Sequence, residues 1–143
     1  MFFESLLNRG ATPALVATMS YAQSRHKMIA ENVANLSTPG YKARQLDSRA
    51  FQCALGEALD RRVRDPHKPF AIKGREFHTD AIGSLKVNPS LRPPDNVLFH
   101  DGTNLSLERE MADLAENTMT HEVAATLLKG RIDGLRKAIR GRA

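Results

Sequence analysis

The side chains that could carry out chemistry are one cysteine, five histidines and sixteen acidic residues. The histidines include no pair four residues apart and no His-Glu-x-x-His pattern, the spacings that place two metal ligands on one face of a helix. Cys53 is the only cysteine, so an internal disulfide and a Cys-x-x-Cys site are excluded. The histidines are His26, His67, His78, His100 and His121. We therefore expect neither a metal site nor a bound cofactor.

Patterns for catalysis are also missing from the sequence. It contains no Gly-rich phosphate-binding loop, no Gly-x-Ser-x-Gly motif, and no cysteine and histidine at a spacing that suggests a nucleophile with its base. The acidic residues are scattered, so no pair is set for general acid and base catalysis. We expect a protein that is not an enzyme and has no small-molecule substrate.

The composition favours long helices. At 143 residues, the chain is expected to form one domain, residues 1–143. Apolar residues make up 41% and aromatic residues 6%, which is typical of helices that bury a single stripe and complete their core with a partner. No apolar run reaches the length of a membrane span, and the first residues lack the pattern of a cleaved signal peptide. We expect no direct membrane insertion.

The net charge of +5 permits nucleic acid, anionic lipid or acidic protein partners. The basic stretch 129–142 could contact phosphate groups, which makes a nucleic-acid-binding module one alternative function. However, its bases surround the apolar residues Leu128, Ile132 and Leu135. Such a stripe favours packing against another helix, so we expect helix–helix assembly and no nucleic acid.

The first long helix is predicted from Thr12 to Leu36. Thr12 is suited to cap the helix and Pro13 to open it. Apolar residues then recur at alternating steps of three and four, a heptad seam broken only by a histidine. This N-terminal seam is Leu15, Met19, Ala22, His26, Ile29, Val33 and Leu36.

A marked stop follows this helix. Pro39 disfavours helical geometry at Thr38, so the helix should end by about residue 37. Pro39 and Gly40 suit the two central positions of a type II turn, where glycine supplies the positive φ. Asn32 and Asn35 could hydrogen-bond backbone groups of the last turn or a neighbouring chain.

The second long helix is predicted over residues 104–140, with Asn104 or Ser106 as its cap. Acidic residues gather in its first part and basic residues in its last part, an order that favours the helix dipole and gives the helix two oppositely charged ends. Its steps of four and three continue without a slip. This C-terminal seam is Leu107, Met111, Leu114, Thr118, His121, Ala125, Leu128, Ile132, Leu135 and Ile139.

The centre, residues 44–100, holds five of the seven prolines. A short helix is predicted over residues 51–63, short strands over 69–74 and 96–102, and a basic linker over 61–69; the rest is expected to be irregular. The predicted fold is therefore all-α, with two long terminal helices paired as an antiparallel coiled coil around a mostly irregular, Pro-rich segment. If Leu36 lies level with Leu107, His26 and His121 fall close together and could fix the register of the pair.

The block from Glu31 to Ala43, ENVANLSTPGYKA, resembles the N-terminal signature of the flagellar axial proteins, the rod and hook family. The stretch from Asp101 to Gly141 resembles the closing helix of that family and points to its B-type proximal rod proteins, with the C-type proteins as the alternative. The residues that match the signature are Asn32, Val33, Ala34, Asn35, Thr38, Pro39, Gly40, Tyr41 and Lys42.

The resemblance implies a structural subunit of the flagellar basal body, in the periplasmic rod, exported without a cleaved signal peptide. The subunits form the shaft between the MS ring and the hook, and motility depends on it. The implied partners are further copies of the chain, FlgC-, FlgF- and FlgG-type rod subunits, a FliE-type adaptor, the MS ring protein and the flagellar export gate. The resemblance divides the chain into residues 1–43, 44–100 and 101–143. A cytoplasmic coiled-coil adaptor is the remaining alternative.

Overall fold

The computed structural model describes residues 10–66, 68–93 and 106–141, and these are mostly helical, as predicted. Three helices are described: α2 (Thr12–Ala34), α3 (Ser48–Arg64) and α4 (Leu107–Ile139). Two small antiparallel sheets complete the fold. One pairs β1 (Arg44–Gln45) with β4 (Ser90–Leu91), and the other pairs β2 (Phe77–Thr79) with β3 (Leu85–Val87).

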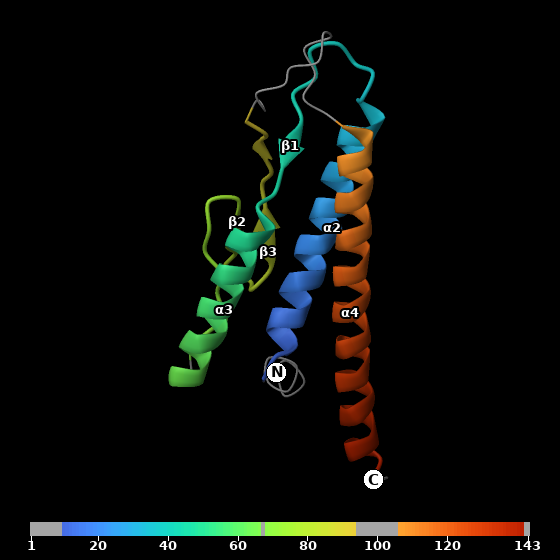
Figure 1. Ribbon diagram of the computed structural model, residues 1–143. Helices are drawn as coiled ribbons and strands as arrows, with labels where there is room; N and C mark the ends of the chain where they lie inside the picture. Colours follow the sequence, from blue (N-terminus) through green and yellow to red (C-terminus); the bar gives the residue numbers. More distant parts are fainter. Residues whose placement is uncertain (1–9, 67, 94–105, 142–143) are drawn as a thin grey trace.

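Helix α2 lies between two partners. Figure 1 shows α4 along one side of it and the centre of the chain, with α3 and the strands, along the other. Contacts between α2 and α4 run in reversed order, because Asn32 near the end of α2 meets Glu110 near the start of α4, while Ala22 meets Asn117 further along. Helix α4 is the longer of the two and continues past the start of α2 (Figure 1).

The two ends of α2 differ in detail from the prediction. Thr12 is not the cap but the first helical residue, and Ala11 precedes it without a capping side chain. Pro13 does stand at the opening of the helix, where its missing N–H costs nothing. At the other end the helix stops at Ala34, because the N–H of Leu36 bonds the carbonyl of Val33 in a tighter turn.

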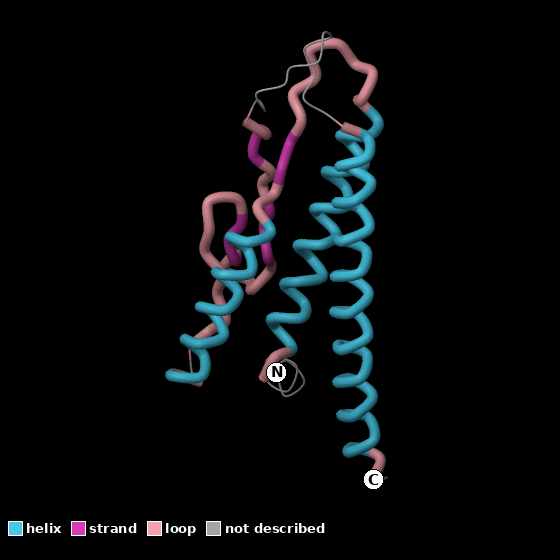
Figure 2. Tube along the Cα trace, in the orientation of Figure 1, coloured by secondary structure: helices cyan, strands magenta, loops and turns pink. Residues whose placement is uncertain are grey.

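The predicted turn after α2 is confirmed. The N–H of Tyr41 donates to the carbonyl of Thr38 at 3.2 Å, and Gly40 between them has φ 74°. Positive φ at the third position of a type II turn is costly for any residue with a Cβ. The Pro-Gly pair therefore reverses the chain and sends it from α2 toward β1 (Figure 2).

The centre holds most of the apolar core, which corrects the expectation of a mostly irregular segment. The rings of Tyr21 and Phe51 stack with centroids 4.0 Å apart, and Phe77 meets both edge-on. Such ring pairs add attraction beyond the apolar area that they bury. The core cluster is Ala17, Tyr21, Met28, Ile29, Leu46, Phe51, Ala54, Ala58, Ile72 and Phe77.

Local sequence features explain how the centre folds. The carboxylate of Asp47 accepts from the N–H of Ala50 and caps α3, which includes the predicted short helix and extends it. The supposed basic linker is wrong in its first part, since residues 61–64 are the last turn of α3. Cys53, the single cysteine, is exposed on this helix.

The predicted strand over residues 69–74 is wrong, since only Lys73 forms an isolated bridge, to His78. The strands lie instead at residues 77–79 and 85–87, where Asp80 and Gly83 close a tight hairpin. Gly74 lies so close to the Phe77 ring that a Cβ there would come within 2.2 Å of a ring carbon. The other predicted strand, residues 96–102, lies outside the described residues.

Helix α4 begins as predicted. The hydroxyl of Ser106 accepts from the N–H of Arg109, while the other candidate cap, Asn104, lies outside the described residues. Glu108 and Glu110 fall in the first turn, and Arg136 and Lys137 fall in the last. These charges complement the helix dipole at both ends.

Candidate assembly site

Asn32 forms the centre of a polar cluster that joins three parts of the chain. Its amide oxygen accepts from the Tyr41 hydroxyl and from the backbone N–H of Arg44, both at 3.1 Å. Its amide nitrogen donates to the carbonyl of Arg44 at 2.9 Å and to the Glu110 carboxylate at 3.2 Å. Asn32 has no exposed surface, and its side chain forms hydrogen bonds to β1 and α4 at the same time.

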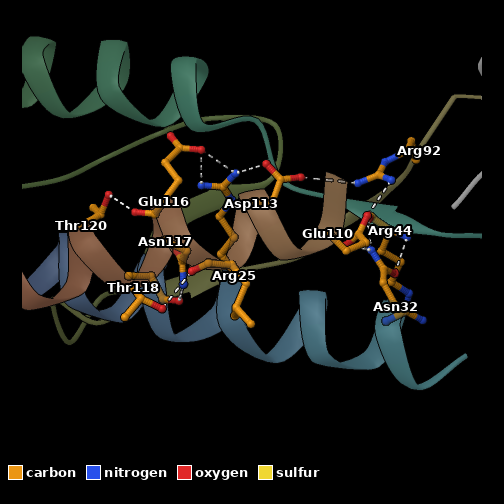
Figure 3. A network of polar contacts seen from close by, with 12 residues as sticks. Arg25, Asn32, Arg44, Arg92, Glu110, Asp113, Glu116, Asn117, Thr118 and Thr120 are labelled. Carbon is orange, nitrogen blue, oxygen red and sulfur yellow. Dashed lines mark hydrogen bonds and ion pairs between the residues drawn. The ribbon is translucent and has the colours of Figure 1, made fainter. Parts of the chain in front are cut away.

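The cluster continues through a buried ion pair. Arg92 lies 2.7 Å from the Glu110 carboxylate, and the exposed fractions of the two side chains are 7% and 0%. Arg92 follows β4, and its N–H donates to the carbonyl of Ala43 beside β1. Figure 3 shows Arg92, Glu110, Asn32 and Arg44 converging where the helices meet the sheet. A buried carboxylate is tolerated only with such partners.

Tyr41 completes the cluster from the turn. Burial raises the pKa of its hydroxyl above the ordinary value, so the group keeps the proton that it donates to Asn32. A second contact lies near the end of the turn, where the Glu31 carboxylate is 4.0 Å from the guanidinium of Arg44. Both groups of this second pair are well exposed, so the pair adds little.

A second polar group joins α2 to α4 further along. Arg25 reaches Asp113 at 3.0 Å and Glu116 at 3.3 Å, with only 10% of its side chain exposed. Asn117 donates to the carbonyl of Ala22 at 2.9 Å and is buried (Figure 3). The contact between α2 and α4 therefore contains amide and charged side chains at two levels, one around Asn32 and one around Arg25.

The predicted N-terminal seam is divided between the two sides of α2. Ala22 and Ile29 are buried, while Leu15, Met19, Val33 and Leu36 are half-buried. His26 is exposed, and His121 is half-buried. The polar side chains that join the two helices at this level are those of Arg25, Asp113, Glu116 and Asn117, and neither histidine is among them.

The predicted C-terminal seam is divided as well. Its residues Leu114, His121, Ala125, Leu128, Ile132 and Leu135 are half-buried, whereas Leu107, Met111, Thr118 and Ile139 are exposed. The buried positions of α4 are Glu110, Asn117 and Ala124, seven residues apart and each one place before a predicted seam residue. The face of α4 toward α2 is therefore rotated by about 100°, the turn of one residue, from the half of the predicted seam that contains Met111, Thr118 and Ala125.

The remaining signature residues lie around the turn. Asn35, directly after the end of α2, donates to the carbonyl of Glu31 in the last turn of the helix, and the Thr38 hydroxyl donates to the Asn35 side chain at 3.3 Å. Val33 is half-buried against the core cluster, whereas Ala34, Pro39 and Lys42 are exposed. The structure thus gathers Asn32, Tyr41 and Gly40 at the joint, packs Val33 against the core, and leaves Ala34, Thr38, Pro39 and Lys42 exposed.

Sequence reasoning missed Arg25, Arg92 and the acidic partners on α4. A signal for the partners exists, because Glu110, Asp113 and Asn117 repeat at steps of three and four, parallel to the apolar seam. For Arg92, in a stretch read as irregular, the sequence offers no comparable signal.

The described residues contain no group of three or more His, Cys, Asp or Glu that could hold a metal ion. Among them, no helix is long and apolar enough to span a membrane. The polar clusters are built from ion pairs and amides that join backbone segments. Their arrangement can hold elements in register.

Comparison with known proteins identifies the class. A family model described as flagella basal body rod protein matches residues 14–42, which include most of α2, Asn32 and the turn. The flagellar basal body rod protein FlgB of Cereibacter sphaeroides is 33% identical over 120 residues, or 83% of this chain and 85% of the relative. FlgB of Bacillus subtilis is 26% identical, with 92% and 95% covered, and FlgB of Escherichia coli is 28% identical, with 78% and 79% covered.

The chain therefore belongs to the FlgB family of flagellar basal body rod proteins. This is a family of structural proteins, so the expectation that the chain is not an enzyme is confirmed. The role in the basal body rod agrees with the resemblance drawn from the sequence.

Proposed function

We propose that the protein is a subunit of the proximal rod, where copies of it assemble with other rod subunits into the shaft that joins the MS ring to the distal rod and hook. The proximal position is supported by the likeness of residues 101–141 to the closing helix of B-type subunits and by the FlgB relatives. Motility would then depend on its incorporation.

The contacts of Asn32 carry this proposal. The side-chain amide of Asn32 hydrogen-bonds both the segment that follows the turn and the first turns of α4. In our interpretation, α2 and α4 form an antiparallel coiled coil, and the Asn32 cluster and the Arg25 cluster fix its register. Buried polar groups in a helix pair specify alignment at a cost in stability. The signature would thus set the angle at which the chain leaves the helix pair.

The whole chain would act as one rod-subunit domain. Residues 1–43 supply the first helix and its turn, residues 44–100 the centre, and residues 101–143 the closing helix. The partners in this proposal are further copies of the chain, FlgC-, FlgF- and FlgG-type subunits, a FliE-type adaptor and the MS ring protein. The protein would reach the periplasm through the flagellar export gate without a cleaved signal.

The first experiment isolates intact basal bodies from native cells that carry a tagged copy of the protein. We expect the tagged protein in these particles, and we expect it to be absent from them in a strain without a working export gate. A soluble protein whose location is the same with and without a working export gate would contradict the proposal and favour a cytoplasmic adaptor.

A pair of variants tests whether the Asn32 cluster matters for assembly. Asn32→Ala removes hydrogen bonds that join separate elements, whereas Asn35→Ala removes only local bonds at the end of α2, to Glu31 and Thr38. Because buried partners are left unsatisfied, Asn32→Ala should lower incorporation about tenfold. Asn35→Ala should lower it much less. Equal loss in both variants would remove the cluster from the proposal.

A further inference from the structure

Helix α4 carries two exposed apolar edges. Leu107 and Met111 form the first edge, with 45% and 52% of their surface exposed. Met119, Val123 and Leu127 form the second edge, with 67%, 60% and 54% exposed. Neither edge is covered by α2 in the described part of the chain, which buries the positions of Glu110, Asn117 and Ala124.

The two edges lie on nearly opposite sides of the helix. Each residue turns an α-helix by about 100°, so Leu107 and Val123, sixteen residues apart, are separated by about 160°. Met111 and Leu127 are separated in the same way. One helix cannot cover both edges. Covering both edges therefore takes two different neighbours, one on each side.

The edges match each other in spacing. The first edge is a pair of large apolar residues four positions apart, and the second continues the same spacing over three residues. An offset of sixteen residues carries Leu107 and Met111 onto Val123 and Leu127. That offset corresponds to about 24 Å along the helix axis. A parallel copy of α4 displaced by this distance would set Leu107 and Met111 beside Val123 and Leu127.

The charges agree with the same offset. Five of the six acidic residues of α4 lie at positions 108–122. Sixteen residues further on, positions 124–138 hold four basic residues and the sixth acidic residue. The four bases are Lys129, Arg131, Arg136 and Lys137. An undisplaced parallel copy would set like charges side by side, which is unfavourable.

We propose that α4 packs laterally on α4 of a second copy, parallel to it and displaced by about 24 Å, with the Leu107–Met111 edge of one copy against the Val123–Leu127 edge of the next. This inference rests on the proposed rod function and adds to it the surface through which neighbouring copies make contact. The contact joins unlike surfaces, so each copy keeps one free edge. Such contacts do not close into pairs and build open helical assemblies.

The first test is cross-linking in basal bodies. A chain with Cys53→Ser, Met111→Cys and Leu127→Cys carries one thiol on each edge. Mild oxidation should give a ladder of dimers, trimers and larger species on a non-reducing gel. Chains with either edge cysteine alone should stay monomeric, because each would face an apolar side chain.

The outcomes separate the two proposals. Dimers from Leu127→Cys alone would show like edges paired and would overturn the inference. No cross-links in basal bodies that do contain the protein would also overturn it, while the rod function would stand. Absence of the protein from basal bodies would overturn both.

Substitutions supply the second test. Leu127→Asp places a charge on one edge and leaves the polar contacts between α2 and α4 intact, and it should lower incorporation at least tenfold. Val63→Asp is the matched control, since Val63 is 81% exposed on α3. Both variants should keep the melting curve of the parent chain. Normal incorporation of Leu127→Asp would contradict the inference.

Discussion

The two sides of α2 are stabilised by different physics. Toward the centre of the chain, α2 presents Tyr21, Met28 and Ile29 to a core of aromatic and aliphatic side chains. Toward α4, it presents Arg25, Asn32 and the carbonyl of Ala22 to carboxylates and amides. One side is an apolar core, and the other is a contact lined by polar groups.

This difference has consequences for assembly. Apolar burial is strong but not directional, whereas buried hydrogen bonds and ion pairs require one alignment. The centre should therefore stay folded on α2 under conditions that release α4. Helix α4 would dock in a single register but with less free energy, which suits an element that must also meet neighbouring subunits.

The largest expected effect is on the apolar side. Phe77 is 2% exposed and meets the rings of Tyr21 and Phe51. Phe77→Ala would leave a cavity among these rings and lower the free energy of unfolding by about 4 kcal/mol. Urea unfolding followed by circular dichroism measures this change. Ile82→Ala, at a side chain that is 91% exposed, is the control and should have almost no effect.

A smaller effect is expected on the polar side. Glu110→Ala leaves the buried Arg92 guanidinium with only the more distant carboxylate of Asp113, 4.0 Å away, and should cost about 3 kcal/mol. Replacing both charges, with Glu110→Leu and Arg92→Met, should recover much of that loss because no charge is then left unpaired. Urea unfolding gives the stabilities, and amide hydrogen exchange reports the docking of α4.

The combined variant sharpens the comparison between the two sides. If the polar contacts specify register, it should be stable but should lose protection along α4. Unchanged protection there would mean that the apolar residues of α4 alone fix its position.

The sequence predicted the parts of the fold that depend on local rules. The Pro39-Gly40 turn, the Ser106 cap and the two long helices follow from backbone preferences that act over a few residues. The short helix over residues 51–63 followed from its apolar spacing. The family resemblance came from the same stretch that holds the Asn32 cluster.

The rest depends on contacts between distant residues. A heptad pattern predicts one buried face, but α2 is buried on two sides, so its apolar and polar positions serve different partners. On α4, Glu110 and Asn117 occupy positions that periodicity assigns to apolar residues. Periodicity cannot show that Arg92, eighteen residues before Glu110, compensates a buried charge. The role of Asn32 is likewise visible only once β1 lies beside it.

The smallest expected effect concerns Tyr21, on the apolar side. Burial raises its pKa to about 12, against the opposing influence of Ser48 and Arg25. Between pH 10 and 12 the unfolded chain loses this proton while the folded protein keeps it. The free energy of unfolding should therefore fall as pH rises through this range, by about 2 kcal/mol at pH 12. Tyr21→Phe keeps the ring contacts and removes the titrating group, so the difference between the two proteins should shrink toward high pH. If the free energies of unfolding of the two proteins change in parallel with pH, the Tyr21 hydroxyl is hydrated in the folded state. Water then reaches this side of α2 despite its apolar contacts.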